Sequence, residues 1–298
     1  MARYVEGPVR VSVPATSANL GPGFDSLGLA LTMRDELEAE VTGSGLVVEV
    51  DGSGADGVPR DESHLVVRSM REAFDAMGAQ PPGLRLSCTN VIPHARGLGS
   101  SSAAIVAGVV LARALVAGGS LLMDDDAAFA LTARIEGHPD NVAPAFYGGF
   151  QISGREGDFY SVGSPVDPRI EVVVFVPPTP VSTEVARGLL PGDVPHADAA
   201  ADAGRTALLV AALAGQPEHL WRGTRDFLHQ GYRRPAMPDS LAFIDALRAD
   251  GVAATVSGAG PTVLAFTDAS GAAALAARCP EGWVAHHLHV DRDGARVL

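Results

Sequence analysis

The feature that constrains this chain most is a glycine- and serine-rich loop that runs directly into an apolar segment. Residues 93–102 contain two glycines and three consecutive serines, and residues 103–115 are mostly alanine, valine and leucine. The apolar segment predicts a buried helix, whose first N–H groups are unpaired and lie at the positive end of its dipole. We therefore expect a phosphate site here rather than a linker, because linkers are not normally followed at once by a helix-forming run.

The absence of lysine excludes several other ways of handling phosphate. All 22 basic residues are arginine. A Walker A loop and a protein kinase each need a lysine at the phosphates, and pyridoxal-phosphate chemistry needs a lysine amine. A nucleoside triphosphate at this loop would have to be held by backbone amides, hydroxyl groups, Mg²⁺ and arginine.

Composition limits the class of protein. A length of 298 residues with 47% hydrophobic content is typical of a globular enzyme with one large or two ordinary domains. The net charge of −13 argues against nucleic-acid binding. No signal peptide or membrane-spanning run is apparent, and Cys88 and Cys279 are isolated. We therefore expect a cytoplasmic protein that binds neither nucleic acid nor membrane.

Strand and helix patterns mix without regular alternation, which favours an α+β fold with two domains. The boundary is expected near residues 154–168. Expected strands lie at 9–14, 46–50, 84–88, 170–176 and as a pair within 253–266; expected helices lie at 63–77, 124–136, 202–214, 217–227 and 240–249; residues 15–25 are expected to form a polar loop.

Three Gly-rich segments recur, at residues 14–25, 93–104 and 256–263. Each lies beside an apolar strand or helix, so we expect their backbones to converge on a ligand. Together they resemble the three motifs of the GHMP small-molecule kinases. Residues 136–145, 182–187 and 229–233 add a resemblance to the homoserine kinase branch, and the likeness covers nearly the whole chain.

The resemblance implies a two-domain GHMP kinase fold. The N-terminal, ATP-binding domain (1–160) would be ribosomal-protein-like, with a left-handed βαβ crossover, and the C-terminal domain (161–298) would be ferredoxin-like. The implied reaction is ATP-dependent phosphorylation of the side-chain hydroxyl of L-homoserine in threonine biosynthesis, with Mg²⁺ as cofactor and a homodimer as the family's assembly.

The same resemblance assigns the nucleotide and metal ligands. Ser101 and Glu136 would hold Mg²⁺, although Glu136 can equally be a charge on a helix surface. His64 stands where the family often has asparagine, and would bond to or stack on the base. The expected ATP-binding residues are His64, Pro93, His94, Ala95, Arg96, Gly97, Leu98, Gly99, Ser100, Ser101, Ser102 and Ala103.

Homoserine is a zwitterion, so its site needs groups of both charges. Arg187 and Arg233 match the positions that would grip the carboxylate, since a guanidinium binds a carboxylate through two parallel bonds. Asp25 and Asn19 would accept the ammonium. Thr183 completes the expected substrate-binding set.

Asn141 and His138 would lie beside the reacting hydroxyl, and with Arg187 they are the expected catalytic residues. Many relatives carry an aspartate base where this chain has Asn141, and asparagine cannot take a proton. Catalysis would then rest on positioning and charge neutralisation, which can suffice for a loose phosphoryl-transfer transition state.

Two alternatives stay open at this point. The chain could be another GHMP kinase that acts on an isoprenoid alcohol or a sugar, although the paired arginines and Asp25 favour an amino acid. It could also be a non-catalytic ligand-binding relative, which would be expected to lose the phosphate loop or the metal carboxylate.

Two further motifs are not expected to be functional. Residues 52–57 match G-x-G-x-x-G, but no helix opens at the last glycine, so we expect a surface loop. Residues 286–289 read His-His-Leu-His on an expected edge strand. No cysteine or cluster of carboxylates lies nearby in the sequence, so a metal site is not expected there.

Overall fold

The structure, a computed structural model, describes residues 3–298 and contains two β-sheets. The larger sheet has the order β11-β1-β2-β4-β3, with β5 and β6 attached at β2, and the smaller sheet has the order β10-β7-β9-β8. The large-sheet strands are β1 (Val9–Asn19), β2 (Gly23–Thr42), β3 (Gly45–Gly52), β4 (Gly83–Asn90), β5 (Phe150–Glu156), β6 (Asp158–Ser164) and β11 (Arg296–Val297). The small-sheet strands are β7 (Glu171–Val176), β8 (Ala254–Val256), β9 (Val263–Thr267) and β10 (Val284–His289).

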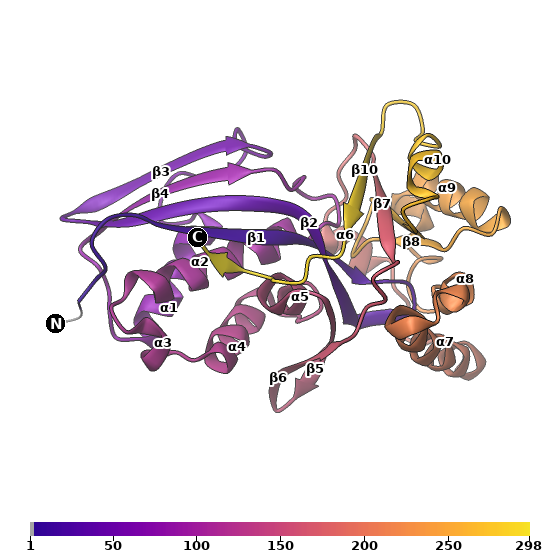
Figure 1. The fold of residues 1–298 in the computed structure, drawn as a ribbon, viewed down its shortest axis with the longest axis horizontal. Helices are drawn as coiled ribbons and strands as arrows, with labels where there is room; N and C mark the ends of the chain where they lie inside the picture. Colours follow the sequence, from indigo (N-terminus) through magenta and orange to yellow (C-terminus); the bar gives the residue numbers. More distant parts are fainter. Residues whose placement is uncertain (1–2) are drawn as a thin grey trace.

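Helices cover one face of the large sheet, as Figure 1 shows for α1 to α5. The end of β2 alternates buried and exposed residues, as expected for a sheet with one face packed and one solvated. The most buried helix is α2, which packs against α1 and β1. These helices are α1 (Leu65–Ala76), α2 (Ser100–Leu115), α3 (Gly119–Leu122), α4 (Asp125–Glu136) and α5 (Val142–Tyr147).

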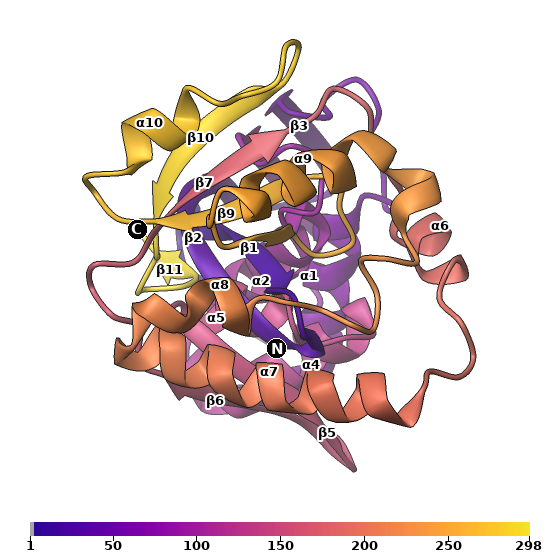
Figure 2. The ribbon, with the colours of Figure 1, turned by 90° about the vertical axis from the view of Figure 1, so that its right-hand side faces the viewer.

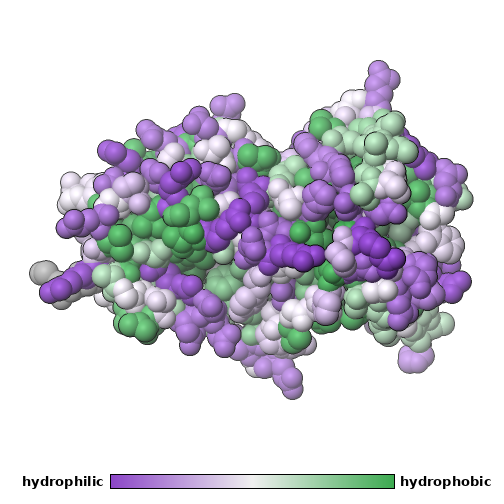
Figure 3. Space-filling view, in the orientation of Figure 1, coloured by the Kyte–Doolittle hydropathy of each residue, from purple (hydrophilic) through white to green (hydrophobic). Residues whose placement is uncertain are grey.

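The remaining helices gather around the small sheet (Figure 2). Helix α9 lies against this sheet, whereas α7 and α8 lie below it and pack on each other. Hydrophilic side chains cover much of both lobes (Figure 3). The helices are α6 (Thr183–Gly188), α7 (His196–Gly215), α8 (Leu220–Gly223), α9 (Pro238–Ala249) and α10 (Ala272–Ala276), with 3₁₀ turns at Pro217–His219 and Arg234–Ala236.

The predicted α+β class with two lobes is confirmed. The chain crosses from the large sheet to the small one between Ser164 and Glu171, and it returns after His289, because Val290 bridges to Leu31 and β11 pairs with β1. The division at 160/161 remains a prediction; β6 continues for a few residues beyond it. Within residues 3–298, no helix is both long and apolar enough to span a bilayer.

Two sequence predictions were wrong in detail. Residues 15–19 belong to β1 rather than to a polar loop, because they pair with β2 and their small side chains are buried. The helix expected at 217–227 ends at Gly223. Beyond it the Asp226 carboxylate accepts backbone N–H groups of residues 228–230, which closes a turn in place of further helix.

Candidate active site

The three Gly-rich segments meet at the junction of the two lobes, as the sequence predicted. The backbone N–H of Thr16 donates to the carbonyl of Leu98 at 3.0 Å. The Ser257 hydroxyl lies 2.6 Å from the carbonyl oxygen of Gly97 and 2.8 Å from the hydroxyl of Ser17. Segments separated by up to 240 positions are thus joined directly by hydrogen bonds.

Two glycines of the central loop are required by close approach to neighbouring segments. Gly97 and Gly99 have φ of 77° and 70°, where side chains are strained. A Cβ on Gly97 would lie 2.2 Å from the carbonyl oxygen of Ser257, and one on Gly99 would lie 2.0 Å from Oγ1 of Thr16. The Thr16 hydroxyl is itself held, because it donates to Oδ1 of Asn141 at 2.8 Å.

These segments enclose a cavity of about 310 Å³ that contains most of the expected site. Its lining comes from both lobes. The residues are Asn19, Phe24, Ala95, Gly97, Gly99, Ser100, Ser101, Glu136, His138, Asp140, Asn141, Val181, Ser182, Thr183, Arg187, Arg233, Gly258, Ala259 and Gly260.

Glu136 faces this cavity rather than forming an ordinary surface charge. It is the last residue of α4, and its Oε1 accepts the hydroxyl of Ser101 at 2.7 Å and that of Ser102 at 2.8 Å. The carboxylate therefore lies at the N-terminus of α2. A carboxylate and two hydroxyl groups are hard oxygen donors, which suit Mg²⁺.

Two arginines line the cavity, and an aspartate just outside the lining pairs with one of them. Arg187 and Asp25 form a bidentate ion pair, with N–O distances of 3.0 and 2.7 Å, and each side chain is 37% exposed. Arg233 is 1% exposed, and burial lowers its pKa to about 10. Its Nη1 lies 3.1 Å from the carbonyl oxygen of Gly258. The ring of Phe24 lies 5.5 Å from each of the two guanidinium carbons, so it spaces the cations.

His138, Asp140 and Asn141 form the third wall. Asp140 is buried, and its Oδ1 lies 2.8 Å from Nδ1 of His138 and accepts the backbone N–H of Asn141 at 3.0 Å. Burial of the imidazole lowers the pKa of His138, but the hydrogen bond and charge of Asp140 outweigh burial and raise it above its ordinary value.

A second cavity of about 360 Å³ lies beside the first and shares Ala95, Ser100 and Ser101 with it. His64 and His94 line it, and burial lowers the pKa of both imidazoles, which favours their neutral forms. Among residues 3–298, Nδ1 of His64 is buried without a hydrogen-bond partner. An unpaired buried nitrogen costs free energy, so it marks a place for a polar ligand atom.

Some predicted residues contribute to neither cavity. The Arg96 guanidinium binds the carbonyls of Pro177 and Pro178, so it ties the loop to the connection after β7. Leu98 and Ala103 are core residues. The other predicted residues outside both cavity linings are Pro93, Ser102 and Asp25, of which the last two contact lining residues.

The sequence reasoning missed several residues of the cavity lining, of which three make contacts that matter to the site. Phe24 and Asp140 lie inside the motifs on which the resemblance rests, but neither was selected. The backbone of Gly258 accepts Nδ2 of Asn19 at 2.8 Å and belongs to the third Gly-rich segment, which was recognised only as a motif. Phe24 and Asp140 each adjoin a residue that was selected, and Gly258 lies in a recognised motif; these positions in the sequence could have identified them.

The chain is similar to known proteins over nearly its whole length. The family model of the GHMP kinase N-terminal domain matches residues 64–149, and that of the C-terminal domain matches residues 206–285. The homoserine kinase of Streptomyces avermitilis is 56% identical over 292 residues, which cover 97% of this chain and 95% of that protein. The chain belongs to the homoserine kinases of the GHMP kinase family.

Other homoserine kinases match over the same extent. The one from Streptomyces coelicolor is 55% identical and covers 97% of this chain, with 94% of its own length matched. The crystal structure of the homoserine kinase from Cytophaga hutchinsonii has a TM-score of 0.87 at 26% identity, and the match covers 100% of this chain and 99% of that one. The two-sheet GHMP fold is thus shared, and membership implies ATP as phosphoryl donor.

Proposed function

We propose that this chain transfers the γ-phosphoryl group of ATP to the side-chain hydroxyl of L-homoserine, giving O-phospho-L-homoserine and ADP. The observation that carries the proposal is the Arg187–Asp25 pair, which lies in contact with the cavity at the N-terminus of α2. A sugar or isoprenoid alcohol has no ammonium group and would leave Asp25 without a cationic partner from the substrate.

The two cavities share lining residues, so together they can hold ATP and homoserine side by side. The first turn of α2 offers backbone N–H groups to the phosphates, and Ser100 and Ser101 belong to both cavities. The base then occupies the second cavity, where the unpaired Nδ1 of His64 is available to a base nitrogen. Homoserine takes the region between Arg187 and Asn141, with Thr183 on the same wall.

Mg²⁺ fits the oxygen donors of Glu136 and Ser101, with Ser102 supporting the same carboxylate. When bound, it neutralises charge on the phosphate oxygens. These hard oxygen donors lie at the N-terminus of α2, which supports a Mg²⁺ site at the phosphate loop.

The substrate zwitterion can replace an existing ion pair. Its carboxylate takes the guanidinium of Arg187, supported by Arg233, and its ammonium takes Asp25, which Asn19 orients by accepting the Asp25 backbone N–H at 3.0 Å. Because Arg187 and Asp25 each have an opposite charge as partner before and after binding, the desolvation of these two groups is largely offset.

Asn141 and His138 orient the hydroxyl toward the phosphorus. Asn141 is itself positioned by Thr16, and His138 by Asp140. Asp140 raises the pKa of His138, so the imidazole holds its proton to higher pH than an ordinary histidine does. The oxygen of homoserine forms the new bond to phosphorus as the bond to the ADP oxygen breaks, and the hydroxyl proton passes to a phosphate oxygen.

The decisive experiment is an ADP-release assay with purified protein, ATP and a panel of homoserine, serine, threonine, mevalonate and galactose. Homoserine should give the highest kcat/KM. Preference for mevalonate or galactose would favour another GHMP kinase, and no ADP release with any member would favour a non-catalytic relative. A homodimer and a cytoplasmic location remain predictions, which gel filtration and cell fractionation can test.

A further inference from the structure

The edge strand β10 carries two histidines on one face, opposite a carboxylate on the neighbouring strand. His287 and His289 are two residues apart, so their side chains leave the same side of the sheet. Glu171, the first residue of β7, is the register partner of His289. These three side chains lie outside the linings of both active-site cavities.

Their ligand atoms are already close together. Nε2 of His287 lies 2.6 Å from Oε2 of Glu171, and Nδ1 of His289 lies 3.4 Å from Oε1. One ligand atom from each residue can be chosen so that all lie within 4.8 Å of one another. Ligands about 2.0–2.1 Å from a tetrahedral zinc ion are about 3.3–3.4 Å apart, so a small rotation of His287 brings the set into range.

We propose that Glu171, His287 and His289 form a binding site for a divalent transition metal, with Zn²⁺ as the natural occupant. Two imidazoles and one carboxylate are the donor types that zinc accepts, and water would complete the coordination. The side chains of His287 and His289 are 38% and 61% exposed, so an ion can reach them directly from solvent.

This site could not be found in the sequence. The carboxylate of Glu171 is 116 positions from His287, so it is not a sequence neighbour of residues 286–289. Antiparallel pairing of β7 with β10 creates the cluster. The expectation that residues 286–289 bind no metal considered only residues nearby in the sequence. It could not take account of the strand register, which brings Glu171 beside His289.

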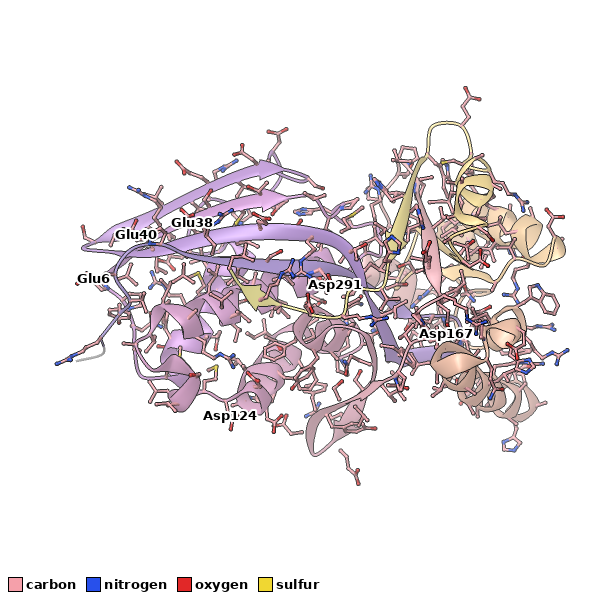
Figure 4. The ribbon with its side chains drawn as sticks, in the orientation of Figure 1. Glu6, Glu38, Glu40, Asp124, Asp167 and Asp291 are labelled. Carbon is pink, nitrogen blue, oxygen red and sulfur yellow. The ribbon has the colours of Figure 1, made fainter. Side chains whose placement is uncertain are left out.

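An ion at this site would link the two places where the chain passes between the sheets. Glu171 opens β7, where the chain enters the small sheet, and His289 closes β10, where it leaves. The exit is anchored to the large sheet, because the His289 backbone N–H donates to Thr32 and Asp291 pairs with Arg34. Asp291 is labelled between the lobes in Figure 4. A bound ion would tie both crossings together at the junction of the lobes.

The test uses tag-free protein stripped with chelator and titrated with Zn²⁺ by calorimetry, with Co²⁺ absorption reporting coordination geometry. The variants are His287→Gln/His289→Gln and, separately, Glu171→Gln. His286→Gln is the matched control, because this histidine lies on the same strand but points to the other face. Circular dichroism, measured without homoserine, checks that each variant is folded.

We expect one Zn²⁺ per chain in the wild type and in His286→Gln, lost in the double variant and weakened at least tenfold in Glu171→Gln. Zn²⁺ should raise the unfolding temperature of the wild type by several degrees and leave the double variant unchanged. Equal Zn²⁺ binding by the wild type and a folded double variant would overturn the proposal. So would no binding by the wild type, which would leave a hydrogen-bonded His–Glu–His cluster without an ion.

Discussion

Arg187 donates two parallel hydrogen bonds to Asp25, which join the two lobes beside the candidate substrate cavity. Arg187 lies on α6 of the second lobe, whereas Asp25 lies at the start of β2 in the first. Asp25 has φ of 54°, an uncommon backbone conformation for a residue other than glycine. The pair therefore presents one charge of each sign where a zwitterion can exchange partners with it.

Replacing Arg187 with leucine should raise the KM for homoserine and barely change the KM for ATP. A hydrogen bond to a charged group contributes about 1.5–3 kcal/mol, so a 10- to 100-fold rise is expected after allowing for partial exposure. Steady-state kinetics with each substrate varied in turn measures the effect.

Arg234→Leu is the matched control for loss of a positive charge. Its guanidinium pairs with Asp245 at the surface, next in sequence to Arg233 but outside the cavity lining. It should leave both KM values close to wild type. If Arg187→Leu raised both KM values equally, the residue would have a phosphate or folding role instead.

Much of the site could be predicted because its residues lie in compact motifs. The loop at residues 93–99 and the helix after it are local features, whereas Glu136 was expected only from the resemblance to the GHMP kinases. The place of Phe24 in the first cavity depends on how the lobes pack, because the other wall residues include Arg187 and Arg233. The second cavity depends on how segments between residues 35 and 104 of the first lobe pack together. Periodicity reports neither. The contact between Gly99 and Oγ1 of Thr16 likewise joins segments far apart in the sequence, so only the structure shows that a side chain at Gly99 would disturb packing.

Replacing Glu136 with glutamine should weaken the response to Mg²⁺. The change keeps shape and hydrogen-bonding capacity but removes the charge that favours the cation. We expect kcat at subsaturating Mg²⁺ to fall at least tenfold and the Mg²⁺ concentration for half-maximal activity to rise. Ser102→Ala should give a smaller effect, because Ser102 acts through Glu136. An unchanged Mg²⁺ dependence in Glu136→Gln would remove this residue from the metal site.

The pH profile of kcat should show no limb that depends on His138. The raised pKa of His138 keeps the imidazole protonated to higher pH, and a protonated imidazole cannot accept the hydroxyl proton. His138→Asn should therefore cost less than about 100-fold in kcat, the lower end of what a general base contributes. A wild-type limb that vanishes in His138→Asn, together with a loss of about three decades, would make His138 the base.

Asp35 should make stability depend on pH. Its carboxylate is buried and accepts the backbone N–H groups of Val91 and Ile92, and burial raises its pKa to about 6. The folded state therefore holds this proton more tightly than the unfolded state, whose aspartate has a pKa of about 3.9. The stabilisation is fully present below about pH 4 and is lost as pH rises to about 6.

Asp35→Asn removes that titration. The free energy of unfolding of the wild type, relative to this variant, should fall by up to about 3 kcal/mol between pH 4 and pH 7. Urea unfolding at the two pH values measures the difference. A difference that stays constant with pH would show that Asp35 does not titrate in this range.

In the proposed function, Arg187 and Asp25 recognise the two charges of an amino-acid substrate. The most direct test compares kcat/KM for homoserine, for 3-aminopropan-1-ol, which lacks the carboxylate, and for 4-hydroxybutyrate, which lacks the ammonium. The wild type should strongly prefer homoserine. Arg187→Leu should lower kcat/KM for homoserine toward that of 3-aminopropan-1-ol without lowering the latter further, and Asp25→Asn should do the same relative to 4-hydroxybutyrate. Equal losses with homoserine and with the analogue lacking the matching charge would contradict the account.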